Sequence, residues 1–372
     1  MGAAPVPVPA RTIRVPPGAR CTIRRWVLWP SWLLIPAVAL LFTAGFTVPR
    51  WAEYLPFFLS LVVFGLPHGA VDHLAAGRLS GRKTWPWSVL AVGFLYLSLG
   101  VLYLVLWFAA PAVAFALFIA MTWFHWGQGD LHALVAFTSG EAGYPPGRTR
   151  RASTLLVRGG LPMLVPLLAF PETYRAVANS TVGLFVPDGS DGLSWAFYGP
   201  SFRLLAGAAF ALIALGVLAS NYASAKRRCA LGAWKVDVME TALLTLYFSF
   251  VPPVLAVGIY FCLWHAPRHV VRLVLLDEGS AGALEAGRVA PALVRFAQDA
   301  APLTGAALVL LLGLYLVATG AGIAPLAFLS LYLVILSVLT LPHVAVVSWM
   351  DLCQGLWRDR HRPLVRTLRQ KG

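Results

Sequence analysis

Six of the eight histidines in this chain lie in four short motifs at or near the ends of long apolar segments. The motifs are FGLPHGAVDH with His68, Asp72 and His73; WFHWGQGD with His125 and Asp130; CLWHAPRH with His265 and His269; and LPHVAVVSWMD with His343 and Asp351. Imidazole and ionisable side chains are costly inside a membrane, so their presence there indicates function. An all-imidazole set suits iron, zinc or copper.

His265 and His269 form the most specific pair among these residues. Their spacing of four places both rings on one face of a helix. Pro267 between them fits the first turn of a new helix, where its missing N–H is harmless. Asp72 and Asp130 lie close in sequence to a histidine, and either carboxylate could orient a ligand through its second ring nitrogen. A lone membrane histidine more often forms a hydrogen bond between helices, so the prediction of a metal site depends on the six histidines together.

The segments that carry these motifs are long enough to cross a bilayer, which takes about 20 residues per helix. Hydrophobic residues make up 59% of the 372 residues and charged residues 12%, which is more apolar surface than a soluble core of this size could bury. Six stretches contain no Asp, Glu, Lys or Arg: residues 26–49, 54–71, 84–129, 204–225, 241–267 and 300–350.

Two of these stretches, 84–129 and 300–350, are long enough for two spans each, with turns at Pro111 and at residues 320–325. The sequence therefore predicts an all-α, polytopic membrane bundle of about eight transmembrane helices. Strands of a membrane barrel would alternate in polarity, whereas these stretches are continuously apolar.

The basic residues lie in short clusters between the apolar stretches, as is typical of loops on the positive side of a membrane. They form no single face or stripe, which argues against nucleic acid as a partner despite the net charge of +14. Residues 1–25 are predicted to be a disordered basic segment, 26–352 a single membrane-embedded domain and 353–372 a basic tail. Both termini are expected on the cytoplasmic side of the inner or plasma membrane. The four cysteines show no pair spacing that would indicate disulfides or a zinc site.

One basic cluster conflicts with the eight-span count. It consists of Lys226, Arg227, Arg228 and Lys235. The cluster falls outside if residues 159–170 form a re-entrant or interfacial piece and 241–267 cross once. A ninth span at 159–170 would move the cluster inside, but it would also move the basic tail out and separate His265 and His269 from the other motifs. A hairpin at Pro252–Pro253 is a further alternative. We expect eight spans, because all four histidine motifs then share the cytoplasmic depth.

The motifs PHGAVDH, FHWGQGD and WHAPRH, followed by a late LPH, closely resemble the Brp/Blh family of bacterial and archaeal β-carotene 15,15′-dioxygenases. The likeness covers residues 55–350, in the same motif order. It implies an all-helical membrane fold and an Fe(II) held by His68, His125, His265 and His269. The chain departs from the family in its long N-terminus, rich in Pro and Arg, and around residues 143–201.

This resemblance implies that the protein cleaves the central double bond of β-carotene with O₂ to give two molecules of retinal, which the family supplies to microbial rhodopsins. Four neutral imidazoles leave coordination positions open for O₂. A very apolar polyene would enter sideways from the lipid. Six further residues are candidates for the surroundings of the metal or for the substrate pocket: Asp72, His73, Asp130, His343, Trp126 and Trp264.

Two other functions fit parts of the pattern. A membrane di-iron desaturase or carotenoid hydroxylase would need more histidines, usually in HxxHH motifs, and this chain has none. A transporter with a histidine and carboxylate proton relay would show inverted repeats around broken helices. Only the Pro252–Pro253 pair and the recurrence of LPH hint at such repeats.

Overall fold

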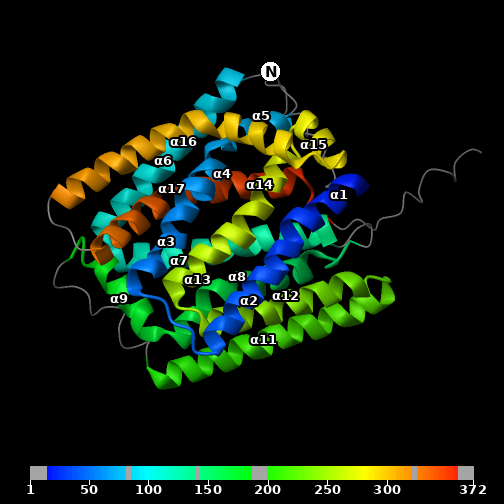
Figure 1. Ribbon diagram of the computed structural model, residues 1–372, viewed down its shortest axis with the longest axis horizontal. Helices are drawn as coiled ribbons and strands as arrows, with labels where there is room; N and C mark the ends of the chain where they lie inside the picture. The colour runs from blue at the N-terminus through cyan, green and yellow to red at the C-terminus, as the bar shows by residue number, and fades with distance from the viewer. Residues whose placement is uncertain (1–14, 81–84, 139–142, 187–198, 321–324, 359–372) are drawn as a thin grey trace, which may run out of the picture.

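The chain forms a bundle of long helices, as the computed structural model in Figure 1 shows. The structure describes residues 15–80, 85–138, 143–186, 199–320 and 325–358, and these residues contain no strand. The first half of the described helices is α1 Pro17–Ile23, η1 Arg24–Leu28, α2 Trp29–Thr43, α3 Arg50–Ser60, η2 Leu61–Gly65, α4 Leu66–Ala70, α5 Asp72–Ser80, α6 Trp85–Ala109, α7 Pro111–Ala133, η3 Leu134–Thr138 and α8 Arg148–Ala169. The second half is α9 Pro171–Val182, α11 Pro200–Arg227, α12 Leu231–Phe250, α13 Pro253–Tyr260, η6 Phe261–His265, α14 Ala266–Val274, α15 Glu278–Glu285, α16 Val289–Gly320 and α17 Pro325–Cys353.

Eight helices are long and apolar enough to cross a membrane. They are Pro17–Thr43, Trp51–Leu79, Trp87–Ala109, Arg148–Ala169, Pro200–Arg227, Pro253–Val274, Val289–Gly313 and Ala327–Cys353. The predicted all-α polytopic bundle of about eight spans is therefore confirmed. Two further helices of similar length, α7 with 23 residues and α12 with 20, pack among these eight.

The identity of the spans differs from the sequence prediction in two places. Residues 159–170 are not a short re-entrant piece, because α8 is a 22-residue helix that tolerates Pro162 and Pro166 in its interior. Residues 241–267 are not one crossing, because α12 ends at Phe250 and α13 begins at Pro253. Val251 and Pro252 between them are extended. Pro252 and Pro253 lack the N–H groups that would continue the ladder of α12, so the chain turns back there.

With these two differences, the cluster formed by Lys226, Arg227, Arg228 and Lys235 lies at the same end of the bundle as the other basic segments. Three hydrogen bonds show which helix ends lie together there. The start of α8 lies beside the end of α17, since Arg148 Nε donates to the Trp357 carbonyl at 3.0 Å. The start of α12 lies beside the end of α11, since Trp234 Nε1 donates to the Leu218 carbonyl at 3.0 Å. The start of α1 lies beside α15, since Thr22 Oγ1 donates to the Leu284 carbonyl at 2.9 Å.

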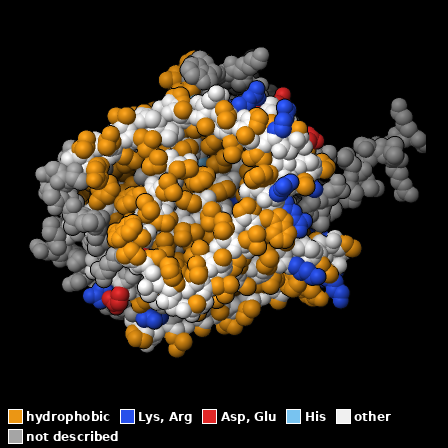
Figure 2. Space-filling view, viewed as in Figure 1, with side chains coloured by type: hydrophobic (Ala, Val, Ile, Leu, Met, Phe, Trp, Pro, Cys, Tyr) orange, Lys and Arg blue, Asp and Glu red, His pale blue; other side chains and the backbone are white. Residues whose placement is uncertain are grey.

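Helices α1, α8, α12 and α16 all begin at one end of the bundle. We use the name basic end for this end. In Figure 2 the Lys and Arg side chains gather mainly at the right, where Figure 1 shows α1 and α15, and the broad face beside them is apolar. The opposite end carries the turns at Ala110, Phe170 and Pro252. The basic cluster that conflicted with the eight-span count therefore lies with the other basic segments.

The segment before the first predicted span also differs from expectation. Residues 17–25, predicted to be disordered, form α1 and the start of η1. Ala19 and Ile23 are buried and pack in one cluster with Val270 and Leu284, so this segment buries an apolar face that its basic composition hides. Residues 1–14 of the predicted basic segment, and 359–372 of the tail, lie outside the described residues.

Three of the four described π-helical turns end just before a proline. Pro30, Pro67 and Pro267 each follow such a turn by two residues. A proline has no N–H to donate and its ring collides with the carbonyl four residues earlier. That carbonyl lies within the π-helical turn in each case, so the wider turn accommodates the ring. Two of these turns directly precede or contain histidines of the motifs, His68 and His265.

The pair α7–α8 is held unusually close by three glycines. A side chain at Gly127 would collide with the Leu155 carbonyl, and one at Gly159 with the Trp123 carbonyl. Gly160 leaves room for the Trp123 and Phe210 rings. This close approach sets the depth of α7, which carries His125.

The arrangement predicts which surface cysteines share a side of the membrane. In a background lacking the other cysteines, Cys229 and a cysteine at Ala286 should react with an impermeant thiol reagent from the same side, because both are exposed at the basic end. A cysteine at Thr47, which is exposed between α2 and α3, should react from the other side. Opposite sidedness for Cys229 and Ala286 would contradict the turn at Pro252.

Candidate metal centre

Five histidine rings from separate parts of the chain meet inside the bundle. His68 lies on α4, His125 on α7, His265 at the end of η6, His269 on α14 and His343 on α17. The distances between neighbouring ring centroids range from 4.8 Å for His125–His343 to 6.4 Å for His265–His269. All five rings are buried. His73, on α5, is the one predicted histidine that the structure does not bring into this group.

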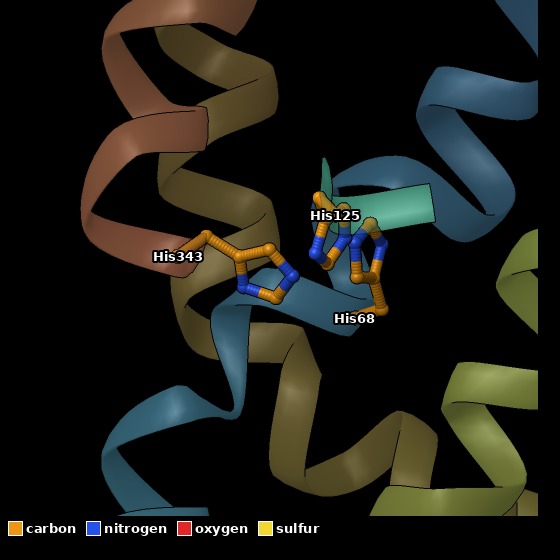
Figure 3. A group of neighbouring side chains, drawn as sticks. All are labelled: His68, His125 and His343. Atoms are coloured by element: carbon orange, nitrogen blue, oxygen red, sulfur yellow. The ribbon is translucent and has the colours of Figure 1, made fainter. Parts of the chain in front are cut away.

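Three of the rings offer nitrogens to a common point. One nitrogen each of His68, His125 and His343 lies within 4.8 Å of the other two (Figure 3). His265 and His269 lie next to this triad, with ring centroids 5.0 Å from His125 and 5.2 Å from His68, respectively. The sequence placed His343 among the surroundings of the metal, whereas the structure places it inside the cluster.

Hydrogen bonds orient two of the rings. His68 Nδ1 lies 2.8 Å from the Phe64 carbonyl, within the π-helical segment that precedes Pro67. His343 Nδ1 lies 2.8 Å from Asp72 Oδ2, and the Tyr96 hydroxyl donates to the same oxygen at 2.6 Å. Because a ring nitrogen bonded to a carbonyl or a carboxylate carries the proton, the other nitrogen of each ring is left as an electron-pair donor.

Seven other ring nitrogens of the cluster have no hydrogen-bond partner among the described residues. These are both nitrogens of His125, His265 and His269, together with Nε2 of His343. A buried polar atom without a partner carries a substantial free-energy cost, and each such atom needs an explanation. Neutral imidazole nitrogens are ligands for iron, zinc and copper ions, so a metal bound among these rings would satisfy them.

Asp130 does not orient a histidine as the sequence predicted. It accepts from Trp264 Nε1 at 2.9 Å and lies 3.4 Å from Arg268 Nη1 and 3.7 Å from Arg158 Nη1. The reason is geometric, because Asp130 lies five residues beyond His125 on α7, more than a helical turn away. Its partner Arg268 lies on α14 next to His269, so Asp130 positions the helix that carries that histidine rather than the ring itself.

Asp130 belongs to a buried ion network that joins five helices. Glu240 receives Arg158 Nη2 at 2.6 Å, Arg268 Nη2 at 2.7 Å and Trp32 Nε1 at 2.7 Å. Asp237 receives Arg158 Nε at 3.1 Å. The side chains of both arginines and all three carboxylates are at most 2% exposed. The network ties α2, α7, α8, α12 and α14 together directly beside the histidines.

The network reaches the basic end through Tyr144, which lies in the turn before α8. Its hydroxyl donates to Asp237 Oδ2 at 2.6 Å. Burial and the neighbouring carboxylate raise the pKa of Tyr144 well above its ordinary value. The phenol therefore remains a neutral donor, and it lowers the cost of burying the Asp237 charge.

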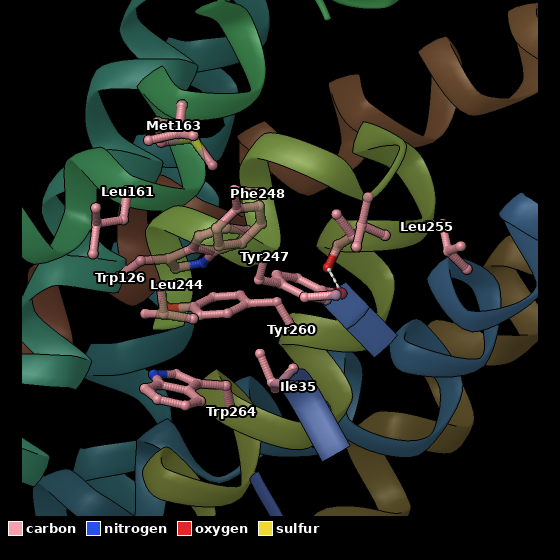
Figure 4. Packing of buried hydrophobic residues seen from close by; sticks show 14 residues of the cluster. Ile35, Trp126, Leu161, Met163, Leu244, Tyr247, Phe248, Leu255, Tyr260 and Trp264 are labelled. Atoms are coloured by element: carbon pink, nitrogen blue, oxygen red, sulfur yellow. Dashed lines mark hydrogen bonds between the residues drawn. The ribbon is translucent and has the colours of Figure 1, made fainter. Parts of the chain in front are cut away.

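The two predicted tryptophans have different surroundings. Trp264 lies under Arg268, whose guanidinium carbon is 3.7 Å from the ring centroid, so it belongs to the ion network. Trp126 packs against Tyr260, with centroids 5.0 Å apart, and lies 5.7 Å from His265. Figure 4 shows both within one apolar cluster, together with Phe248 and Tyr247.

An apolar pocket opens onto the histidine triad. His68, His125 and His343 line it at one end, and Trp126 and Phe261 lie beside them. From there the lining runs along α3, α7, α13 and α17 to α9 at the end opposite the basic end. A few hydroxyls, such as those of Ser60, Thr122 and Thr340, are the polar groups among mostly aliphatic and aromatic side chains.

The sequence analysis missed the ion network, although it left a signal. Arg158, Asp237 and Glu240 are isolated charges within helices that lie inside the bundle, and intramembrane charges indicate structure or function by default. Gln128 was also missed. It donates to Asp351 Oδ2 at 2.9 Å, and Asp351 receives Arg272 Nη2 at 2.8 Å, so a second ion pair ties α7, α14 and α17 together.

The fold and this centre define a multi-pass membrane protein with a buried histidine cluster suited to a metal ion. The chain belongs to the β-carotene 15,15′-dioxygenase family, which residues 59–351 match. It is 46% identical over 357 residues to a Halobacterium salinarum (NRC-1) protein named Probable beta-carotene 15,15′-dioxygenase Blh, covering 96% of this chain and all of that protein. It is 28% identical to the H. salinarum (R1) protein Probable beta-carotene 15,15′-dioxygenase Brp, over 87% of this chain and 90% of that one. No solved structure matches the chain.

The ion network predicts a large effect of a single neutral substitution. Glu240→Gln removes one charge from between two buried arginines, and breaking a buried pair costs about 3–5 kcal/mol. We expect a correspondingly lower free energy of unfolding in detergent. The matched control is Glu172→Gln, because Glu172 is 82% exposed in its pair with Arg175 and should change stability by no more than about 0.5 kcal/mol. Equal stabilities of the two variants would contradict the assigned role of the network.

Proposed function

We propose that this protein cleaves the central 15,15′ double bond of β-carotene with O₂ to give two molecules of all-trans-retinal, using Fe(II) at the histidine cluster. The observation that carries the proposal is the meeting of five buried imidazoles, with unpartnered nitrogens, at one end of a long apolar pocket. Family membership over most of the chain supports the same reaction. We place this activity in residues 26–352 as a single catalytic domain.

The family resemblance assigns His68, His125, His265 and His269 as the iron ligands, and the geometry supports adding His343. A nitrogen of His343 lies within 4.8 Å of one nitrogen each of His68 and His125. Asp72 fixes the orientation of the His343 ring through Nδ1. Five nitrogen donors would still leave one position of an octahedral ion free.

Bound iron would supply a reduced centre at which O₂ is activated. In the overall reaction the C15–C15′ double bond is broken and each of the two carbons receives one oxygen atom, so the atoms of β-carotene and O₂ are all found in two aldehydes. The task of the protein is to place the correct bond and to exclude water. Trp126, Phe261 and Thr122 line the pocket next to the histidines and would hold the polyene there. No acid or base residue is required by this balance.

The apolar exterior suits a substrate dissolved in lipid. The face shown in Figure 2 is largely apolar between its charged ends. Leu204 and Leu205 on α11, Leu312 on α16 and Phe94 on α6 are all more than half exposed, as side chains facing lipid are. Retinal is equally apolar and would leave into the same phase, where a microbial rhodopsin is the expected recipient.

We further propose that the basic end faces the cytoplasm of a cell that carries the protein in its inner or plasma membrane. Positive residues near the ends of spans favour the cytoplasmic side. The crossing of α8 brings Lys226 to the same end as Arg148, and the turn at Pro252 keeps Arg295 there as well, so this orientation puts most of the described basic residues beside the cytoplasm. Arg175 and Arg203 lie at the opposite end. Protection of Cys229 from an impermeant reagent in intact cells tests it.

The alternatives differ in metal content. A di-iron hydroxylase or desaturase would hold two irons and a proton-relay transporter none. The dense group of five histidines without a bridging carboxylate favours a single ion. The Asp72 carboxylate is next to the cluster, but its Oδ2 accepts hydrogen bonds from His343 Nδ1 at 2.8 Å and from the Tyr96 hydroxyl at 2.6 Å.

The metal assignment predicts the effect of removing single rings. Purified protein should contain about one iron per chain, as expected of a mononuclear site. His265→Ala and His269→Ala should lose the iron and the activity while the protein still inserts in the membrane. Asp72→Asn should retain more iron than either, because Asp72 acts through His343, with a loss of about 10–100-fold in affinity or activity. Full iron occupancy in His265→Ala would remove that residue from the ligand set.

The reaction predicts both the product and the origin of its oxygen. Cells that accumulate β-carotene should lose their orange colour when they express the protein and should yield retinal. Under ¹⁸O₂, mass spectrometry of rapidly trapped retinal should show label in both aldehydes. Label from water in one of them, at times too short for carbonyl exchange, would replace the dioxygenase reaction by a monooxygenase reaction.

A further inference from the structure

Two ring pairs mark the two ends of the substrate pocket. At one end the rings of His68 and His343 lie 4.9 Å apart. At the other end Phe57 and Tyr332 meet edge to face, with centroids 5.5 Å apart and an interplanar angle of 83°. All four side chains line the pocket. The first member of each pair belongs to the α3–η2–α4 segment and the second to α17.

The separation between the two ring pairs is the same on both helices. Phe57 precedes His68 by 11 residues, and Tyr332 precedes His343 by 11 residues. A helical rise of 1.5 Å per residue makes this about 16 Å along α17, and the segment from Phe57 to His68, which contains the π-helical turn η2, is slightly shorter. The third long wall agrees, because Phe115 precedes His125 on α7 by 10 residues, or about 15 Å.

The far end of the pocket is a packed wall. Phe57, Tyr332 and Leu329 are buried and form one cluster with Val177 of α9 and Val254 of α13. The α9 helix is fastened across this end, since Ser330 Oγ donates to Ser180 Oγ at 2.8 Å. This cluster therefore closes the far end of the pocket around the aromatic pair, and Leu329, which also lines the pocket, lies about one turn beyond Tyr332 on α17.

The depth of the pocket matches half of β-carotene. An extended zigzag chain advances about 1.2 Å per bond, as in an extended peptide backbone. From the central carbon to the ionone ring there are nine bonds, and the ring adds a few ångströms more, so the half-molecule is on the order of 15 Å long. The molecule is symmetrical, so fixing the position of one ring also fixes the position of its central bond.

We propose that Phe57 and Tyr332 act as the end-stop of a half-length ruler. One ionone ring of β-carotene rests against this aromatic pair, and the C15–C15′ bond is thereby held at the histidine cluster. The two residues are specificity determinants that act by position and take no part in the chemistry. This inference rests on the proposed function and adds to it the means by which the central bond is selected.

The ruler predicts that shortening either aromatic side chain changes the bond that is cleaved. Phe57→Ala and Tyr332→Ala deepen the pocket, so the polyene slides further and the next double bond reaches the metal. The products are then a longer aldehyde and a shorter methyl ketone in place of two retinals. A change of this size in an apolar pocket alters discrimination by on the order of tenfold or more. We expect the ratio of unequal products to retinal to rise by about that factor.

The experiment uses the full-length protein in detergent with iron restored and β-carotene as substrate, with chromatography of all cleavage products. Phe108→Ala is the matched control, because Phe108 on α6 is exposed and packs on Phe185 without lining the pocket. Tyr332→Phe keeps the ring and should yield only retinal. Iron content and the amount of purified protein report whether each variant folds, and Tyr332→Leu replaces any variant that does not accumulate.

The outcomes separate the two proposals. Unequal products from Phe57→Ala and Tyr332→Ala, with retinal alone from Phe108→Ala and Tyr332→Phe, would support the ruler. Retinal as the sole product of all variants, at any rate of turnover, would overturn the ruler and leave the proposed function intact. No cleavage of β-carotene by the iron-loaded wild type would overturn the proposed function and the ruler with it.

Discussion

The burial of two arginines among three carboxylates is the constraint on which the rest of this bundle depends. Arg158 and Arg268 could not lie inside an apolar bundle without Asp130, Asp237 and Glu240, because an unpaired buried charge costs several kcal/mol. Each pair joins different helices, so satisfying the charges also sets how those helices lie together. Arg268 lies between His265 and His269 in the sequence, and the network thereby holds their helix against α7.

Within that frame the chain separates a polar half from an apolar half. The ion network, the pair Arg272–Asp351 and the hydrogen bond from His343 Nδ1 to Asp72 lie on one side of the histidine cluster. The apolar pocket lies on the other side and ends at α9. A metal held between the two halves would have charged groups behind it and an apolar space in front, where the exclusion of water limits side reactions.

Much of this arrangement follows from local signals in the sequence. The apolar stretches predicted a helical membrane bundle, and Pro267 was expected in the first turn of a helix, where α14 has it. The sequence did not reveal that Pro67 and Pro267 follow π-helical turns, since that depends on how the preceding carbonyls relax. It also missed the turn at Pro252, because an apolar stretch reads alike whether it crosses once or folds back. The separate error at residues 159–170, most of which belong to the long helix α8, put the basic residues around Lys226 at the opposite end from the other basic segments.

The sequence by itself determined the class of protein, since hydropathy and the histidine motifs are local patterns that survive without coordinates. It identified every histidine that the structure brings together, and with the family resemblance it indicated the reaction. Only the tertiary structure decided that His343 joins the cluster while His73 stays apart, and that Asp72 rather than Asp130 orients a ring. It alone placed Phe57 and Tyr332 at the far end of the pocket. These are contacts between residues hundreds of positions apart, and they depend on how whole helices pack, which no local pattern records.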